Sequence, residues 1–306
     1  MKRQPGTRLP GVESGASERL RRLVHRIYDL PTFPLIITKL MEVAEDPKSS
    51  SSDLAEVMEK DQGLSAKILK LVNSAFYSFS KPVSSLKHAI TLVGYNSIRS
   101  LAISVSMKNL IQIESEIFDQ KRFWEHSLVV ALGTRLLAEM HRFPMKEDAF
   151  TAGLMHDVGI LLKARYFPDE LVEAREKMIS RRISLCAAEE EVLGVNHTLL
   201  GAWLAEHWRL PPLLREPILR HHQLEEGPLS AAQQRSMEPE HVQVLGYVTV
   251  ANCLARASGY AHNDETTFRE EIVPAHLDQI LLDQTFEELR VAILKRLNKS
   301  REFLSI

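Results

Sequence analysis

Cysteine is scarce in this chain of 306 residues, which contains only Cys186 and Cys253. Two cysteines cannot build the disulfide framework that staples small secreted domains. Their scarcity is typical of proteins in a reducing compartment. We therefore expect a cytoplasmic location.

Long hydrophobic runs are also missing. The longest stretch without Lys, Arg, Asp or Glu runs from His241 to Ala255 and includes Gln243, Thr249 and Asn252. It is shorter than the about 20 mainly apolar residues that cross a bilayer. The N-terminal segment MKRQPGTRLPGVESGAS is basic but lacks the apolar core of a signal peptide. The sequence predicts neither a membrane span nor secretion.

No charge of one sign dominates, because 38 basic side chains face 40 acidic ones and the net charge is −2. A hydrophobic fraction of 44% beside 25% charged residues is ordinary for a globular protein and excludes global disorder. The near balance of charge also argues against broad binding to a phosphate backbone, so we do not expect a nucleic-acid partner.

Strand signals are lacking, since no segment alternates apolar and polar residues for long and no Asn-Gly or Asp-Gly hairpin occurs. Apolar residues instead recur at helical spacing, beginning at Ser17, a candidate N-cap. The expected helices after it are 35–45, 53–60, 64–76, 84–93, 97–108, 122–141, 147–166, 169–180, 184–192, 197–208, 211–222, 241–258 and 284–298. The predicted fold class is all-α.

The chain divides into three parts at the level of composition. Residues 1–16 are rich in Gly, Pro and Ser and are typical of a flexible tail. A polar connector near 115–121 separates an N-terminal helical lobe, 17–118, from a second lobe, 119–306, with C-terminal helices. A polar loop is expected at about 224–239.

Histidines and one aspartate follow a suggestive order in the second lobe. The residues are His126, the pair His156 and Asp157, His197, and the pair His221 and His222. Each lies among apolar residues in or beside an expected helix. A single histidine in such a place is more often a packed core residue, but helices of a bundle can bring an ordered set to one interior point. Imidazoles with a bridging carboxylate predict a site for one or two transition-metal ions (Fe, Mn, Ni or Zn).

Three segments of the first lobe give the chain a family resemblance: LPTFPLIITKL, DLAEVMEKDQGLSAKILKLVNSAFY and VSSLKHAITLVGYNSIRSLAIS. They resemble the HDOD domain, a helical module of bacterial signalling proteins related to the HD phosphohydrolases, over about residues 23–225. The resemblance implies an HD-like bundle with an N-terminal lobe and a role as a signalling output module.

The second lobe also resembles the HD-GYP branch of cyclic di-GMP phosphodiesterases, in which the matching positions bind a two- or three-metal centre. The resemblance implies metal-ligand roles for His126, His156, Asp157, His197, His221, His222 and, at the final aspartate position, Asn252. Three departures stand out. QLEEGPLS replaces the Gly-Tyr-Pro loop, Ile160 replaces a lysine, and Asn252 brings no charge. Losing a carboxylate and a phosphate-facing cation weakens transition-state stabilisation.

Two functions follow from this pattern. The first is a non-catalytic module whose metal-capable pocket serves a signalling protein partner or a nucleotide ligand. The alternative is a metal-dependent phosphohydrolase acting on a cyclic dinucleotide or another nucleotide, with Asp157 in its catalytic centre. A helix–turn–helix at 53–76, with Lys67 and Lys70 on its second helix, is a third hypothesis, but ordinary helix packing explains the spacing better.

Overall fold

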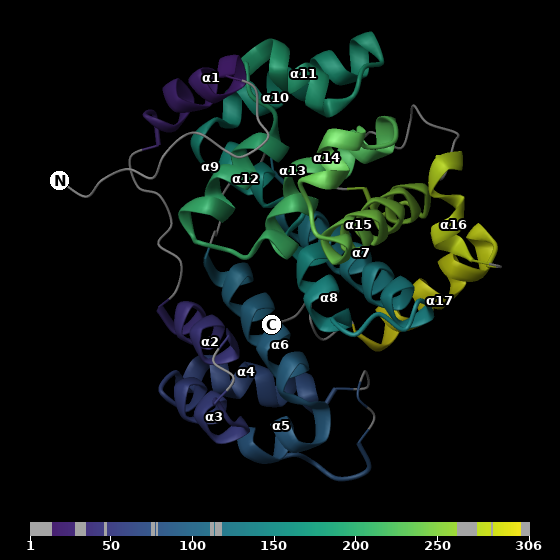
Figure 1. The fold of residues 1–306 in the computed structure, drawn as a ribbon. Helices are drawn as coiled ribbons and strands as arrows, with labels where there is room; N and C mark the ends of the chain where they lie inside the picture. Colours follow the sequence, from purple (N-terminus) through teal and green to yellow (C-terminus); the bar gives the residue numbers. More distant parts are fainter. Residues whose placement is uncertain are drawn as a thin grey trace. The chain divides into compact units, whose positions relative to one another are not determined.

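The computed structural model describes residues 14–27, 35–45, 48–74, 77, 79–110, 113, 118–261, 274–282 and 284–300. Every regular element in these residues is a helix, so the all-α prediction is confirmed (Figure 1). The chain forms two compact units. The larger unit comprises 1–30 and 113–290, and the smaller unit comprises 31–112 and 291–306.

The smaller unit is built from short amphipathic helices. They are α2 (Leu35–Glu45), α3 (Ser51–Glu59), α4 (Gln62–Val72), α5 (Leu86–Val93) and α6 (Tyr95–Leu110). Ser50, Asp61 and Ser85 cap the N-termini of α3, α4 and α5 by accepting hydrogen bonds from backbone N–H groups of the first turn. Buried aliphatic side chains such as Leu54, Ile68 and Leu71 form its core.

The larger unit contains most of the chain. Its helices are α1 (Ser14–Val24), α7 (Gln120–Met140), α8 (Lys146–Met155), α9 (Val158–Tyr166), α10 (Pro168–Arg181), α11 (Leu185–Leu193), α12 (His197–His207), α13 (Pro212–Glu226), α14 (Ala231–Arg235), α15 (Pro239–Ala257), η2 (Ala275–Leu277) and α16 (Asp278–Leu281). The long helices α7 and α15 pack on each other and on α8, while α13 packs on α8, α12 and α15. The helix α17 (Phe286–Lys299) begins in the larger unit, and its residues from 291 onward belong to the smaller one.

The expected single helix at 147–166 is wrong. The structure has two helices there, α8 and α9, and the backbone leaves helical geometry at Asp157 (φ −104°, ψ 17°). Gly159 follows the break and explains why α9 lies so close to α12. A Cβ at Gly159 would come within 1.9 Å of the carbonyl oxygen of His197. At this break, Oδ1 of Asp157 lies 3.4 Å from Nε2 of His197, the first residue of α12.

Other boundaries also differ from expectation. The helix α4 ends at Val72, four residues before the expected end, because the side-chain amide of Asn73 donates to the carbonyl oxygens of Leu69 and Val83. The expected loop at 224–239 contains the end of α13 and the short helix α14. The first helix, α1, belongs to the larger unit although it precedes the smaller one in the sequence.

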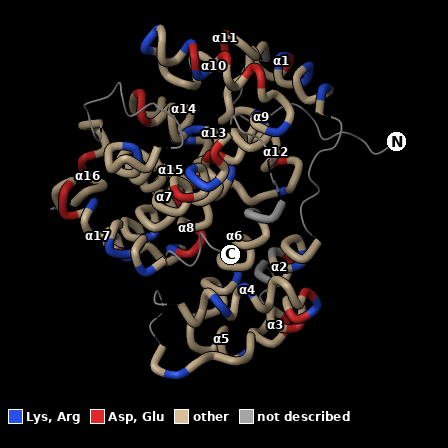
Figure 2. Tube along the Cα trace, turned by 180° about the vertical axis from the view of Figure 1, so that it is seen from behind, with Lys and Arg blue, Asp and Glu red and all other residues tan. Residues whose placement is uncertain are grey.

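Charges are mixed along the surface helices. Figure 2 shows Lys and Arg interspersed with Asp and Glu on α10 and α17, whereas the charged residues of α11 are all glutamates. None of the helices in the described residues combines the length and the apolar character needed to cross a membrane.

Candidate metal centre

The candidate ligands all lie in the helix bundle of the larger unit. His126 lies on α7, His156 ends α8, Asp157 precedes α9, His197 begins α12, and His221 and His222 lie on α13. The first five of these side chains are 0–2% exposed, and His222 is partly exposed. The bundle thus brings six predicted site residues, from positions far apart in the sequence, to one interior point.

Asp157 is at the centre of this cluster. Its Oδ2 lies 3.5 Å from Nε2 of His126 and 3.1 Å from Nε2 of His156. Its Oδ1 lies 3.4 Å from Nε2 of His197 and 3.3 Å from Nε2 of His221. One carboxylate therefore faces imidazole nitrogens on both sides, as a ligand that bridges two ions would.

Two ligand groups share Asp157. One consists of His126, His156 and Asp157, and the other of Asp157, His197, His221 and His222; within each group the ligand atoms lie within 4.8 Å of one another. We name the group with His126 and His156 the carbonyl-backed side, because Nδ1 of each histidine donates to a backbone carbonyl. We name the group with His197, His221 and His222 the carboxylate-backed side, because Nδ1 of His197 and of His222 lies against a carboxylate.

Hydrogen bonds on the second ring nitrogen orient each imidazole. On the carbonyl-backed side, Nδ1 of His126 donates to the carbonyl oxygen of Tyr260 and Nδ1 of His156 donates to that of Gly153, at 2.5 and 2.7 Å. A carbonyl oxygen only accepts, so Nδ1 carries the proton and Nε2 is the nitrogen offered to the centre.

The carboxylate-backed side uses charged partners for two of its histidines. Nδ1 of His197 lies 2.7 Å from Oε2 of Glu189, and Nδ1 of His222 lies 3.0 Å from Oε2 of Glu225. The third, His221, donates from Nδ1 to the carbonyl oxygen of Pro217 at 2.9 Å. Carboxylate–imidazole pairs of this kind orient the histidines of metal sites in general.

Burial and neighbouring charges shift the pKa values of the cluster in opposite directions. Burial lowers the pKa of His156 to about 3, although Asp157 opposes the change, and burial together with His221 lowers the pKa of His222 to about 4. Burial alone would raise the pKa of Asp157, but the imidazoles around it, His156 foremost, hold it well below its usual range. At neutral pH, Asp157 is thus ionised and His156 and His222 are neutral, which are the forms that bind metal ions.

His197 differs from its neighbours. Burial lowers its pKa, but the Glu189 carboxylate more than offsets burial, and the net pKa lies well above the usual value. A metal ion bound at Nε2 of His197 would therefore displace a proton.

Orphaned polar atoms support a fit between this cluster and a metal ion. Nε2 of His197, Nε2 of His221 and Oδ1 of Asn252 are buried and have no hydrogen-bond partner among the described residues. A buried polar atom without a partner costs free energy that a bound cation would recover. The donor set of imidazoles and one carboxylate suits Fe, Mn, Ni or Zn.

Asn252 lies on the side of α15 that packs against α13. Thr249, one turn earlier, donates to the carbonyl oxygen of His221 at 3.3 Å, and Arg256, one turn later, pairs with Glu225. Residues three and four positions apart share a helix face, so Asn252 lies between these two contacts with α13. Its role as a seventh ligand stays a prediction.

The charged residues behind the ligands were not among the predicted site residues. Lys163 and Glu189 are 0% exposed and paired at 3.3 Å, and Glu225 is paired with Arg256. Cys186 also lies close, with Sγ 3.9 Å from Nδ1 of His197. The one available signal was Lys163 itself, which interrupts the apolar segment GILLKA of α9 where a solvent-facing lysine is unexpected.

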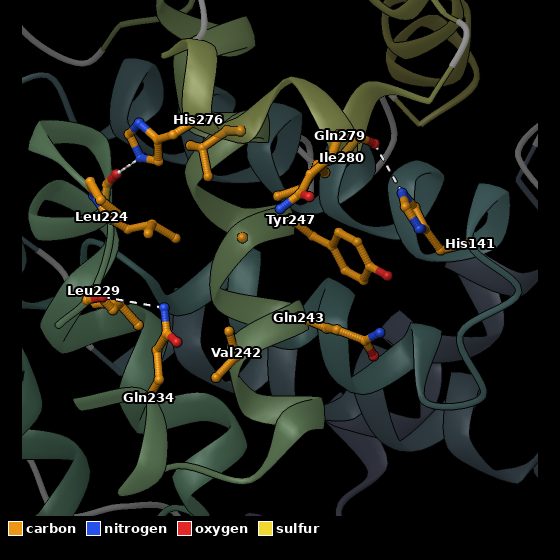
Figure 3. A pocket seen from close by; sticks show the side chains of 13 residues that line it. His141, Leu224, Leu229, Gln234, Val242, Gln243, Tyr247, His276, Gln279 and Ile280 are labelled. Carbon is orange, nitrogen blue, oxygen red and sulfur yellow. Dashed lines mark hydrogen bonds between the residues drawn. The ribbon is translucent and has the colours of Figure 1, made fainter. Parts of the chain in front are cut away.

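A cavity of about 380 Å³ lies elsewhere in the larger unit, between α13, α14, α15 and α16 (Figure 3). His276 and His141 are among its lining residues and donate from Nε2 to the carbonyl oxygens of Leu224 and Ile280, at 2.8 and 2.9 Å. None of its lining residues is Lys, Arg, Asp or Glu, and none is a candidate ligand. It therefore offers no lysine or arginine to a phosphate and is not part of the metal centre.

The fold and this cluster define a helical protein of the HD type, and comparison with known proteins identifies its family. The HDOD domain model matches residues 30–224, so the chain belongs to the HDOD domain family. An uncharacterized protein of Treponema pallidum (strain Nichols) is 26% identical over 220 residues, which are 71% of this chain and 42% of that protein. The chain thus spans less than half the length of that relative.

Solved structures show the same fold. An HDOD domain protein with unknown function from Geobacter sulfurreducens matches with a TM-score of 0.71 at 22% identity, covering 94% of this chain and 95% of that one. A Shewanella amazonensis SB2B protein named "Putative phosphohydrolase" matches with a TM-score of 0.69 at 23% identity, covering 95% and 97%. A Marinobacter aquaeolei VT8 protein named "Putative signal transduction protein" matches with a TM-score of 0.72 at 19% identity, covering 97% and 66%. At these identities the likeness concerns the fold.

Proposed function

We propose that this chain is a signalling output module of the HDOD family that holds one or two transition-metal ions without hydrolysing phosphate esters. The metal would be held by His126, His156, Asp157, His197, His221 and His222, with Asn252 as a further oxygen donor. When bound, such an ion supplies a Lewis acid and a fixed charge in the bundle interior.

The observation that supports the non-catalytic function is the chemistry at position 160. Ile160 lies on α9 three residues after Asp157, where the HD-GYP pattern has a lysine, and it is 0% exposed. An isoleucine there cannot neutralise a phosphate in the transition state. Asn252 removes a negative charge from the same centre, which weakens its hold on the ions and its power to activate a bound water.

Metal content is the first test. We expect wild-type protein, purified without chelators or a His-tag, to contain near-stoichiometric iron, manganese, nickel or zinc by elemental analysis. The His156→Ala and Asp157→Ala variants should lose it, and His88→Ala, which removes an exposed histidine of the smaller unit, should keep it. A folded wild type free of metal would overturn the metal-binding part of the proposal.

Turnover decides between the two functions. We expect the metal-loaded protein, supplied with Mn²⁺ or Fe²⁺, to leave cyclic di-GMP and bis-p-nitrophenyl phosphate intact. Turnover that disappears in Asp157→Ala but survives in His88→Ala would establish the alternative, a metal-dependent phosphohydrolase. The name of the Shewanella neighbour makes this assay worthwhile.

The output would pass to a separate signalling protein or be governed by a nucleotide ligand. A nucleic-acid partner is disfavoured by the charges on the α3–α4 hairpin. Lys67 and Lys70 lie on α4, but Asp53, Glu56 and Glu59 lie on the neighbouring α3 (Figure 2). A helix pair with this mixture would repel a phosphate backbone as much as attract it.

A further inference from the structure

The two sides of Asp157 are supported by different chemistry. Behind the carbonyl-backed side, Nδ1 of His126 and Nδ1 of His156 donate to the peptide carbonyls of Tyr260 and Gly153. Behind the carboxylate-backed side lie two buried chains of charge, each running from a cation through a carboxylate to an imidazole. The first is Lys163–Glu189–His197 and the second is Arg256–Glu225–His222.

The first chain holds His197 at both its backbone and its ring. Oε2 of Glu189 accepts from the backbone N–H of His197 at 2.8 Å and from its Nδ1 at 2.7 Å. The other oxygen, Oε1, lies 3.3 Å from Nζ of Lys163, which also donates to the carbonyl oxygen of Val195 at 2.7 Å. One backbone hydrogen bond and one ion pair therefore fix the carboxylate, and the contact with Val195 fixes the lysine. The carboxylate in turn fixes the imidazole with Nε2 toward Asp157.

The second chain repeats this arrangement on α13 and α15. Glu225 lies one turn after His222, and its two carboxylate oxygens bind different partners: Oε2 lies 3.0 Å from Nδ1 of His222, and Oε1 pairs with Arg256. Glu225 is 7% exposed, so this pair too is largely removed from water. This second chain of charged residues thus places another electron-rich imidazole, that of His222, in the ligand group of His197.

Carboxylates behind imidazoles make them stronger ligands, because a partly transferred Nδ1 proton leaves more electron density on Nε2. Buried ion pairs, by contrast, contribute little to folding and are often replaceable by apolar residues. Among the described contacts, two such pairs lie behind one ligand group and none lies behind the other. Metal affinity explains this difference better than stability does.

We propose that the two metal positions are unequal and fill in order: the position between Asp157 Oδ1, His197, His221 and His222 first, and the position between Asp157 Oδ2, His126 and His156 second. Lys163, Glu189, Glu225 and Arg256 are positioning residues for the first ion. Lys163 in particular acts through Glu189 and does not replace the phosphate-facing lysine absent at Ile160. This inference rests on the proposed metal centre.

Titration of the chelator-treated full chain with Co²⁺ tests the order, read by calorimetry and by the visible absorption of bound cobalt. We expect two binding events of different affinity in the wild type. Glu189→Gln, Glu225→Gln and the charge-free double variant Lys163→Met/Glu189→Gln should each weaken the first event 10–100-fold and leave the second nearly unchanged. His126→Ala should abolish the second event and keep the first.

Glu191→Gln is the matched control, because Glu191 lies on the same helix as Glu189 but is exposed and pairs with Arg181. It should change neither event. The order is overturned if His126→Ala removes the tighter event, or if Glu189→Gln and Glu225→Gln weaken both events equally. If Glu189→Gln fails to fold with Lys163 unpaired, the double variant and Glu225→Gln decide alone. A wild type that binds no cobalt would instead refute the metal centre itself.

Discussion

The two units differ in what they bury. In the smaller unit, the buried polar side chains of the described residues are all serines: Ser74, Ser97, Ser100, Ser104, Ser106 and Ser300. The larger unit buries charged and titratable groups, among them Asp157, Lys163, Glu189 and Arg220, beside its histidines. A helical serine hydroxyl can bond to the carbonyl one turn back, as Ser104 does to Ser100 at 2.7 Å. A buried charge instead needs an opposite charge beside it, as Lys163 has in Glu189.

The contrast indicates a division of labour. Removing two charges from water costs several kcal/mol per ion before their attraction recovers it, so a fold selected for packing alone avoids them. The smaller unit follows that rule. The larger unit departs from it, and Lys163 and Glu189 do so directly behind the imidazoles, at the kind of site where natural proteins accept a stability cost for function.

The largest loss of stability should follow when one partner of a buried ion pair is removed and the other is left in place. We expect Lys163→Met to destabilise the larger unit by about 3–5 kcal/mol, because it leaves the Glu189 carboxylate buried without its cation. Lys163→Met/Glu189→Gln should recover most of that loss. Trp124, Trp203 and Trp208 all lie in the larger unit, so urea unfolding followed by tryptophan fluorescence reports on it. Equal losses in the single and double variants would show that the pair is not the cause.

Low pH should lower the free energy of unfolding by a somewhat smaller amount, through the carboxylate of the same Lys163–Glu189 pair. Burial alone would raise the pKa of Glu189, but Lys163 and His197 bring it down to about 2 from an ordinary 4.5. Between these values the unfolded chain binds more protons than the folded one, so stability is present above pH 4.5 and falls as the pH drops toward 2. We expect metal-free wild type to lose on the order of 3 kcal/mol more across this window than Lys163→Met/Glu189→Gln. Parallel curves from urea unfolding at several pH values would contradict this.

Much of this arrangement could be predicted from the sequence, because its signals are local. Helical periodicity located most of the helices, and the order of the histidines pointed to the residues that now surround Asp157. No local sequence signal indicated that the expected helix at 147–166 is divided into α8 and α9. No proline marks it, and it depends on the close packing of Gly159 against the backbone at His197.

The charged chains behind the ligands were not predictable for a different reason. Glu189 is the first of three consecutive glutamates, and nothing in their identity separates the buried Glu189 from the exposed Glu190 and Glu191. Only the phase of α11 against α9 and α12 decides which one meets Lys163. Glu225 likewise sat in a segment expected to be a loop, and the continuation of α13 to Glu226 is what places it one turn beyond His222.

The smallest effect concerns Asn73, the residue that directly follows α4 in the smaller unit. Its side chain donates to the carbonyl oxygens of Leu69 and Val83, both at 2.8 Å, and accepts from the backbone N–H of Val83 at 2.7 Å. It therefore ends α4 and closes the following loop. We expect Asn73→Ala to cost about 1 kcal/mol in urea unfolding followed by circular dichroism, since these bonds lie near solvent.

The Asn73→Asp variant sharpens this expectation, because the carboxylate can still accept from Val83 but can no longer donate to the two carbonyls. It should lose about as much stability as Asn73→Ala or more, and neither variant should change the cobalt titration. A variant that kept full stability but failed to bind a signalling partner would show instead that this residue forms a recognition surface. The smaller unit would then hold function as well as packing, and the contrast between the units would rest on the kind of chemistry each one performs.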